Sequence, residues 1–238
     1  MRVIKAGKSV LRKAKNVAKA AVQSVGIAGS ATGSTRKRVG QKSSTQLEKS
    51  TLQSMLSNTY MPNSMSGPVG SYIPDPTLSD NRVKVYHDAS TNHTVVAHRG
   101  SQTKADWLEN GLYAMGIKGG ANYNHSKKVQ KAAEKKYGSS NLTTVGHSKG
   151  ALHAQEFGQH GDIATLNKPV NVKDALFYKV PKNQTDYRGE GDAVSALRFA
   201  QRGNKAVTLK KGKSEKSSYN PFKNLLTEHG TATLERES

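Results

Sequence analysis

Apolar and polar positions follow a regular order from residue 83 onward. Short runs rich in β-branched residues, typical of buried strands, alternate with longer segments in which apolar residues recur every three or four positions, typical of helices. This order predicts an α/β fold, with a mostly parallel sheet flanked by helices. The predicted strands are 83–86, 94–98, 141–145, 163–166, 175–180 and 206–209, and the predicted helices are 104–115, 126–137, 149–158, 193–200 and 220–226.

The first 25 residues carry a different pattern. Their apolar residues, mostly Ala and Val, fall on one face of a helix, and lysines and arginines occupy the other faces. A basic amphipathic helix of this kind suits an anionic membrane interface. A solvated tail that binds polyanions fits equally well, and a mitochondrial presequence is a minor alternative.

Composition then divides the chain into three parts. Residues 26–46 are rich in Gly, Ser, Thr and Lys and are typical of a flexible linker. Residues 61–82 hold four of the seven prolines, while 51–60 has the pattern of a short helix. The predicted parts are a basic amphipathic arm with a flexible linker (1–46), an irregular Pro-rich lead-in (47–82) and the α/β domain (83–238).

The charge is strongly positive and uneven. The 238 residues include 37 Lys and Arg against 17 Asp and Glu, and eleven of the basic residues, with no acid, lie in residues 1–42. This balance predicts an acidic partner, either an anionic membrane or, through residues 1–42, nucleic acid. The lack of Cys excludes disulfides and thiolate zinc sites, and the absence of a long apolar run predicts a soluble or membrane-peripheral protein.

The most informative motif lies between the predicted strand 141–145 and the helix after it. Gly146-His147-Ser148-Lys149-Gly150 has the Gly-x-Ser-x-Gly pattern of a nucleophile elbow. The sharp turn from strand to helix forces the serine into a strained conformation and crowds its neighbours, so the two flanking positions need glycine. We therefore predict that Ser148 is a nucleophile and that the backbone N–H of Lys149 stabilises an oxyanion.

A serine nucleophile needs a base. Three histidines follow Ser148 in the chain. His153 lies on the helix after the serine and His160 lies just beyond it, so both are predicted to be packing or surface residues. His229 lies near the end of the domain, where a late loop can bring an imidazole back to the serine, and it is the predicted base.

The acid that orients the base is predicted to be Asp192. It follows the predicted strand 175–180, in a glycine-rich loop at the edge of the sheet where such residues belong. An alternative role for Asp192 is the N-cap of helix 193–200. In that case, Asp186 and Glu190 are the rival acids.

Two further features complete the predicted site. Ser101 follows strand 94–98 and is predicted to supply the second oxyanion donor, the alternative being an ordinary Gly-Ser turn. Trp107, Leu112 and Tyr113 form a possible apolar flap, the alternative being a core helix. No cofactor or metal is predicted, because the histidines have no recognised ligand spacing.

Over residues 83–232, the sequence resembles the class 3 (fungal-type) lipase family of α/β-hydrolases. The resemblance rests on ordered blocks: Val95–Ser101, Asp106-Trp107-Leu108, Val145–Ala151, Thr165–Pro169, Gly191-Asp192-Ala193-Val194 and Glu228-His229-Gly230. It implies a compact α/β-hydrolase that acts on lipid or other carboxylic esters, as a lipase, esterase or phospholipase does. The implied site residues are Ser148 as nucleophile, Asp192 as acid, His229 as base, and Ser101 with the Lys149 N–H as oxyanion hole. Lys149 and Ala193 depart from the usual apolar residue and proline.

A second resemblance, to lipase-like proteins of large DNA viruses and virophages, rests on the basic arm and the compact domain. It implies a virion or host-cytoplasm location. The leading hypothesis is a serine ester hydrolase that works at a lipid interface. The alternatives are an inactive, virion-associated binding protein that uses its arm to hold membrane or nucleic acid, and a peptidase or thioesterase on the same fold. The sequence does not indicate an oligomeric state.

Overall fold

The structure is a computed structural model of the whole chain, which divides into residues 1–43 and residues 44–238. It describes residues 47–102, 119–170, 172–192, 195, 202–203, 205–211 and 229–236. The predicted arm and linker, the flap residues Trp107, Leu112 and Tyr113, and the helices at 104–115 and 220–226 lie outside the described residues. The same holds for helix 193–200 apart from Ser195.

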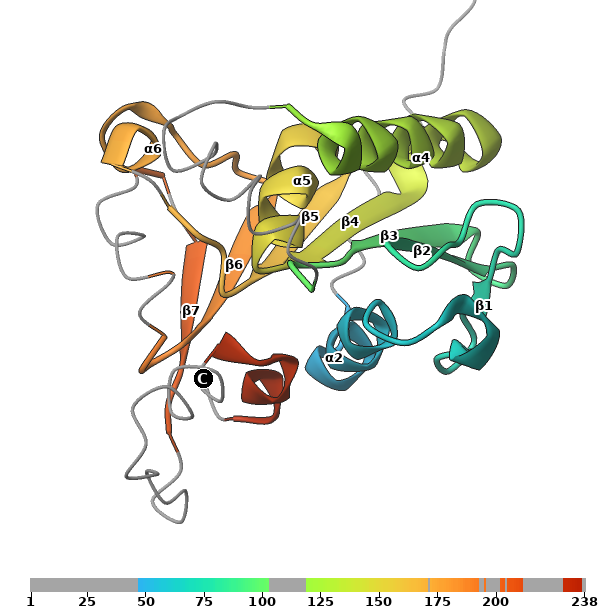
Figure 1. Cartoon of the computed structure of the whole chain (residues 1–238), viewed down its shortest axis with the longest axis horizontal. Helices are drawn as coiled ribbons and strands as arrows, with labels where there is room; N and C mark the ends of the chain where they lie inside the picture. The colour runs from blue at the N-terminus through green and yellow to red at the C-terminus, as the bar shows by residue number, and fades with distance from the viewer. Residues whose placement is uncertain are drawn as a thin grey trace, which may run out of the picture. The chain divides into compact units, whose positions relative to one another are not determined.

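Within the described part of the chain, seven strands form one sheet in sequence order (Figure 1). The first three strands pair antiparallel at one edge, and every pair from β3 to β7 is parallel. The strands are β1 (Ile73–Pro74), β2 (Val83–Asp88), β3 (His93–His98), β4 (Leu142–His147), β5 (Asp162–Leu166), β6 (Gln184–Gly189) and β7 (Lys205–Leu209). The mostly parallel α/β sheet predicted from the sequence is therefore confirmed.

Helices lie on both faces of this sheet. α4 (Ala121–Tyr137) and α5 (Lys149–Phe157) cover one face, and α2 (Lys49–Asn58) and η4 (Thr231–Glu235) cover the other (Figure 1). The remaining helical elements are η1 (Asn63–Met65), η2 (Ser139–Asn141) and α6 (Val172–Phe177). Among the described residues, no helix combines the length and apolar character needed to cross a membrane.

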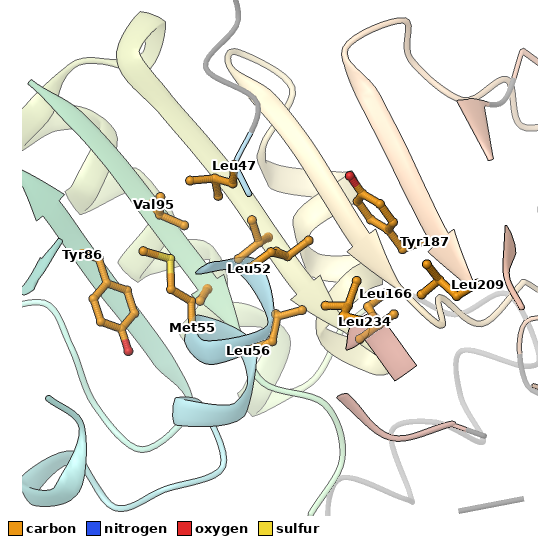
Figure 2. Close-up of a cluster of buried hydrophobic side chains, with 12 residues drawn as sticks. Leu47, Leu52, Met55, Leu56, Tyr86, Val95, Leu166, Tyr187, Leu209 and Leu234 are labelled. Atoms are coloured by element: carbon orange, nitrogen blue, oxygen red, sulfur yellow. The ribbon is translucent and has the colours of Figure 1, made fainter. Parts of the chain in front are cut away.

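The larger hydrophobic core lies between the sheet and the pair formed by α2 and η4. Leu52, Met55 and Leu56 of α2 point toward the sheet, and Leu234 of η4 joins the same cluster beside Leu166 (Figure 2). Polar contacts also join α2 to the η4 segment: Lys49 Nζ donates to the carbonyl of Arg236, and the Ser57 and Thr231 hydroxyls lie 3.0 Å apart. Part of the predicted Pro-rich lead-in, residues 47–82, therefore lies in the core of the same unit as the sheet.

The prediction of a strand at residues 175–180 is wrong. Helix α6 occupies the first half of that segment, residues 175–177, and the sixth strand, β6, lies further on, at Gln184–Gly189. The segment is apolar and aromatic, but Leu176 and Phe177 are 56% and 81% exposed. β6 has the sequence QTDYRG and is nevertheless mostly buried, because Gln184 and Asp186 have polar partners and Tyr187 joins the hydrophobic core. Hydrophobicity therefore indicated the wrong segment.

We expect Leu56→Ala to lower the free energy of unfolding by about 2–5 kcal/mol, because it opens a cavity in a fully buried core. Urea denaturation measures this change. Ser54→Ala, at an exposed position of the same helix, is the matched control and should change stability by less than about 0.5 kcal/mol. Equal stability of the two variants would show that α2 does not contribute to the fold.

Candidate active site

Ser148 stands alone between a strand and a helix. β4 ends at His147 and α5 begins at Lys149, so the chain reverses direction at one residue. Ser148 adopts φ 54° and ψ −126°, a conformation that costs a non-glycine residue free energy. Its N–H donates to the carbonyl of Leu166 in β5 (3.0 Å), and its own carbonyl accepts from the N–H of Ala151 (2.9 Å). The strained residue is thus held at the carboxyl end of β4.

The two glycines of the motif allow α5 to approach the strands closely. A Cβ atom at Gly146 would overlap the backbone of Gly150, and a Cβ atom at Gly150 would overlap the carbonyl of His98 in β3. No rotamer change relieves a clash with backbone. The geometry therefore supports the predicted reason for glycine at both positions.

His229 bridges Ser148 and Asp192. Its Nε2 lies 2.7 Å from Ser148 Oγ, and its Nδ1 lies 2.9 Å from Asp192 Oδ1. The Asp192 side chain is fully buried, and that of His229 is 17% exposed. Because a carboxylate only accepts hydrogen bonds, Nδ1 carries the proton of the neutral ring. Nε2 is then left to accept the proton of the serine hydroxyl.

Asp192 fits both of its predicted roles. While Oδ1 contacts His229, Oδ2 accepts the backbone N–H of Ser195 (3.1 Å), which is the contact of a capping residue. The N–H of Asp192 donates to the carbonyl of Gly189 at the end of β6 (3.1 Å). Each carboxylate oxygen therefore has a different partner, and the capping bond to Oδ2 holds the carboxylate so that Oδ1 faces the histidine.

The two rival acids have other partners. Asp186 is buried in β6, where Lys168 Nζ lies 3.1 Å from Oδ2 and the Thr165 hydroxyl donates to Oδ1 (2.5 Å). Glu190 is exposed, and its carboxylate accepts the N–H of Lys211 (3.2 Å). Asp186 therefore serves the packing of β5 against β6.

The other two candidate histidines lie as the sequence predicted, in packing and at the surface. The His153 ring is buried on α5 and stacks on Phe157, with ring centroids 5.7 Å apart. His160 is exposed in the turn after α5. The structure brings only His229 of the three into hydrogen-bond contact with Ser148.

The backbone carbonyl of His229 is held by two side chains. His147 Nε2 donates to it at 2.6 Å and Asn167 Nδ2 at 3.0 Å. Asn167 is fully buried with φ 49°, and its side-chain oxygen accepts the N–H of Gly189 (2.8 Å). Sequence reasoning named His147 only as part of the elbow and did not name Asn167. The available signal for Asn167 was a polar residue directly after a parallel strand.

Tyr60 extends this network, and sequence reasoning missed it as well. Its hydroxyl lies 2.6 Å from His147 Nδ1 and accepts the N–H of Gly100 at 3.0 Å. Because a carbonyl cannot donate, His147 Nε2 must carry the ring proton toward His229, and Nδ1 accepts the Tyr60 hydroxyl proton. Burial, together with the positive charge available to His229, lowers the pKa of His147 to about 4. The ring is therefore neutral near pH 7.

The predicted oxyanion donors are Lys149 and Ser101. Lys149 follows Ser148 directly and is the first residue of α5. Gly100 packs so closely that a Cβ atom there would lie 2.9 Å from Ser148 Cβ, and half-buried Ser101 follows it. Among the described residues, no group of three or more His, Asp or Glu side chains is placed to hold a metal ion.

No family model matches this sequence, and no curated protein matches it. Solved structures similar to the chain include several lipases. Lip2 lipase from Yarrowia lipolytica is 14% identical over 68% of this chain and 77% of its own, with a TM-score of 0.44. The Rhizomucor miehei lipase in its propeptide complex is 12% identical over 78% of each chain, with a TM-score of 0.43.

A triacylglycerol lipase from Penicillium expansum is 15% identical over 67% of this chain and 77% of its own, with a TM-score of 0.41. These similarities give no support to the second, viral resemblance.

The buried His147 makes stability depend on pH. Its pKa is about 4 when folded and about 6.5 when unfolded, so the unfolded chain binds more protons between these values. Its contribution to the free energy of unfolding therefore falls as pH falls, by about 2 kcal/mol from pH 7 to pH 5. Urea denaturation at both pH values should show a smaller loss in His147→Gln than in the unchanged protein.

His98 provides a positive control. It is fully buried, and burial lowers its pKa to about 4 as well. His98→Gln should reduce the pH dependence by a similar amount. If neither variant reduces it, the two rings are not neutral in the folded protein.

Proposed function

We propose that this protein is a serine ester hydrolase of the lipase type. The observation that supports this most directly is the continuous chain of hydrogen bonds from Asp192 through His229 to Ser148. It ends on a serine held in a strained turn at the carboxyl end of a central parallel strand. This combination of residues and conformation matches what an activated serine nucleophile requires.

In the proposed reaction, Ser148 Oγ attacks the carbonyl carbon of an ester. His229 Nε2 takes the hydroxyl proton, and the buried Asp192 carboxylate stabilises the imidazolium that forms. The carbonyl oxygen becomes an oxyanion. We assign its stabilisation to the backbone N–H of Lys149, at the positive end of α5, and to the backbone N–H or hydroxyl of Ser101.

The second half of the reaction uses the same residues. The proton on His229 passes to the alcohol that leaves, and the acyl group stays on Ser148. Water, deprotonated by His229, then attacks the acyl-enzyme and releases the acid. Every proton in this cycle moves between Ser148, His229, water and substrate, so the proposed chemistry requires no cofactor.

The proposed substrates are carboxylic esters, with lipid esters favoured by the lipase-type blocks of the sequence. A peptidase or thioesterase would use the same residues. Matched esters, thioesters and amides of one acyl chain distinguish these activities. The ester should be turned over at the highest kcat/KM, and a clear preference for the amide or thioester would assign the site to that class instead.

Ser148→Ala should lower kcat for a p-nitrophenyl ester by about 10⁴-fold or more, because the nucleophile is lost. Asp192→Asn should also cost about 10⁴-fold, because the wrong histidine tautomer is favoured. A fluorophosphonate probe should label the unchanged protein at Ser148, as peptide mass spectrometry would show.

The matched control for this experiment is Ser140→Ala, at an exposed position outside the site. It should keep full activity and labelling. A folded protein that neither labels nor hydrolyses any ester would refute the proposal and favour the inactive binding protein. Hydrolysis that is unchanged in Ser148→Ala would place the activity elsewhere.

We also propose that the basic residues in positions 1–42 bring the enzyme to an anionic lipid surface. Removing them should leave probe labelling intact and abolish co-sedimentation with phosphatidylserine vesicles, because eleven positive charges are lost. Association of the full chain should weaken with salt. Vesicle association that survives the truncation would contradict this role, and binding of DNA in preference to vesicles would favour the nucleic-acid alternative.

A further inference from the structure

We propose that Tyr60 and His147 are positioning residues that hold the backbone of His229 in register with Ser148. This inference rests on the proposed function, since it assigns a role to the hydrogen bonds that hold His229, the proposed base. Tyr60 and His147 act through the His229 carbonyl and through the segment that carries Ser101.

Two neighbouring residues hold opposite parts of His229. Ser148 Oγ meets its ring at 2.7 Å, and His147 Nε2 donates to its backbone carbonyl at 2.6 Å. Residues 147 and 148 are rigidly joined at the end of a buried central strand. A displacement of His229 therefore breaks the hydrogen bond to His147 as well as the one to Ser148. The ring is held by Ser148 and Asp192, and the bond from His147 fixes the backbone from which that ring projects.

The hydrogen bonds from Gly100 to His229 all run in one direction. The N–H of Gly100 donates to the Tyr60 oxygen, the Tyr60 hydroxyl donates to His147 Nδ1, and His147 Nε2–H donates to the His229 carbonyl. The Tyr60 hydroxyl and the His147 ring each accept one hydrogen bond and donate one in the same direction, so the bonds polarise one another. This order requires a neutral His147. Burial maintains that state by lowering the pKa of the ring to about 4.

The network joins the proposed oxyanion side of the site to the base. Gly100 precedes Ser101 and packs against Ser148, so the Tyr60 hydroxyl fixes the backbone on the proposed oxyanion side. The same hydroxyl, through His147, fixes the base. Tyr60 itself follows α2, whose leucines are anchored in the core. Tyr60, which lies outside the sheet, thereby fixes the Gly100 segment and the base His229 relative to each other.

The chain contains a matched pair that lies away from this site. The Tyr72 hydroxyl is 2.8 Å from His93 Nδ1, and His93 Nε2 is 2.9 Å from Thr143 Oγ1. The Tyr72 and His93 ring centroids are 5.8 Å apart, against 5.7 Å for Tyr60 and His147. His93 begins β3, at the end of the strand opposite Gly100. The same interaction therefore occurs once beside the candidate site and once as structure alone.

The experiment compares Tyr60→Phe with Tyr72→Phe. Each variant deletes one hydroxyl that contacts a buried histidine, so both should lower the melting temperature. Tyr60→Phe should lower it somewhat more, because it also removes the acceptor of the Gly100 N–H. Tyr60→Phe should lower kcat on a p-nitrophenyl ester by about 10- to 100-fold with little change in KM, because the base is misplaced. Fluorophosphonate labelling should slow in parallel. Tyr72→Phe should keep kcat within about twofold.

Two substitutions of His147 separate positioning from general structure. The side-chain nitrogen of Gln extends to about where imidazole Nε2 lies, so His147→Gln can still donate to the His229 carbonyl. Asn is one methylene shorter and replaces only the Nδ1 side. We expect the kcat of His147→Gln to exceed that of His147→Asn by more than about tenfold. His93→Gln and His93→Asn, the controls, should not differ in kcat.

A second readout does not depend on turnover. In nitrogen NMR spectra of the histidine rings, the His229 signals should shift in Tyr60→Phe and stay unchanged in Tyr72→Phe. Absent labelling and hydrolysis in the unchanged protein would refute the proposed function alone, and the NMR comparison would still decide the positioning. If Tyr60→Phe behaves as Tyr72→Phe does in both kcat and the His229 signals, the positioning role is wrong.

Discussion

The reversal of the chain at Ser148 is the constraint on which the rest of the site depends. A strand and a helix meet there with a single residue between them, and the only backbone solution is a positive φ. This geometry forces glycine at positions 146 and 150 and brings α5 against β3. It also turns the serine hydroxyl away from the core. The free energy stored in this turn is offset by the buried strands on either side.

The fold and the three central residues could be predicted because each leaves a local signal. The glycine pair marks the turn, alternating apolar runs mark most strands, and a late histidine completes the chain order of an α/β-hydrolase. Asp192 was selected although the strand assigned before it was wrong. The true strand, β6, ends only a few residues before Asp192, so the error in the strand did not move the loop.

Other parts of the site left no such signal. β6 is polar in sequence. Its Asp186 carboxylate accepts hydrogen bonds from the side chains of Gln184 and Lys168, so these buried residues leave no apolar pattern. Tyr60 lies before the alternating region, and nothing in its local sequence distinguishes it from Tyr72. Its role depends on a contact with a residue 87 positions away, which only the tertiary structure specifies. Long-range polar contacts of this kind carry no periodicity.

The contact between α2 and η4 also sets an order of events during synthesis. Lys49 Nζ donates to the carbonyl of Arg236, and the Ser57 and Thr231 hydroxyls lie 3.0 Å apart, so segments almost at opposite ends of the described chain meet. As the chain leaves the ribosome, α2 emerges early, and its contact with η4 forms only after the strands between them have been made. His229 lies just before η4 and arrives with it. A nascent chain therefore completes this core and brings His229 to Ser148 at the same late stage.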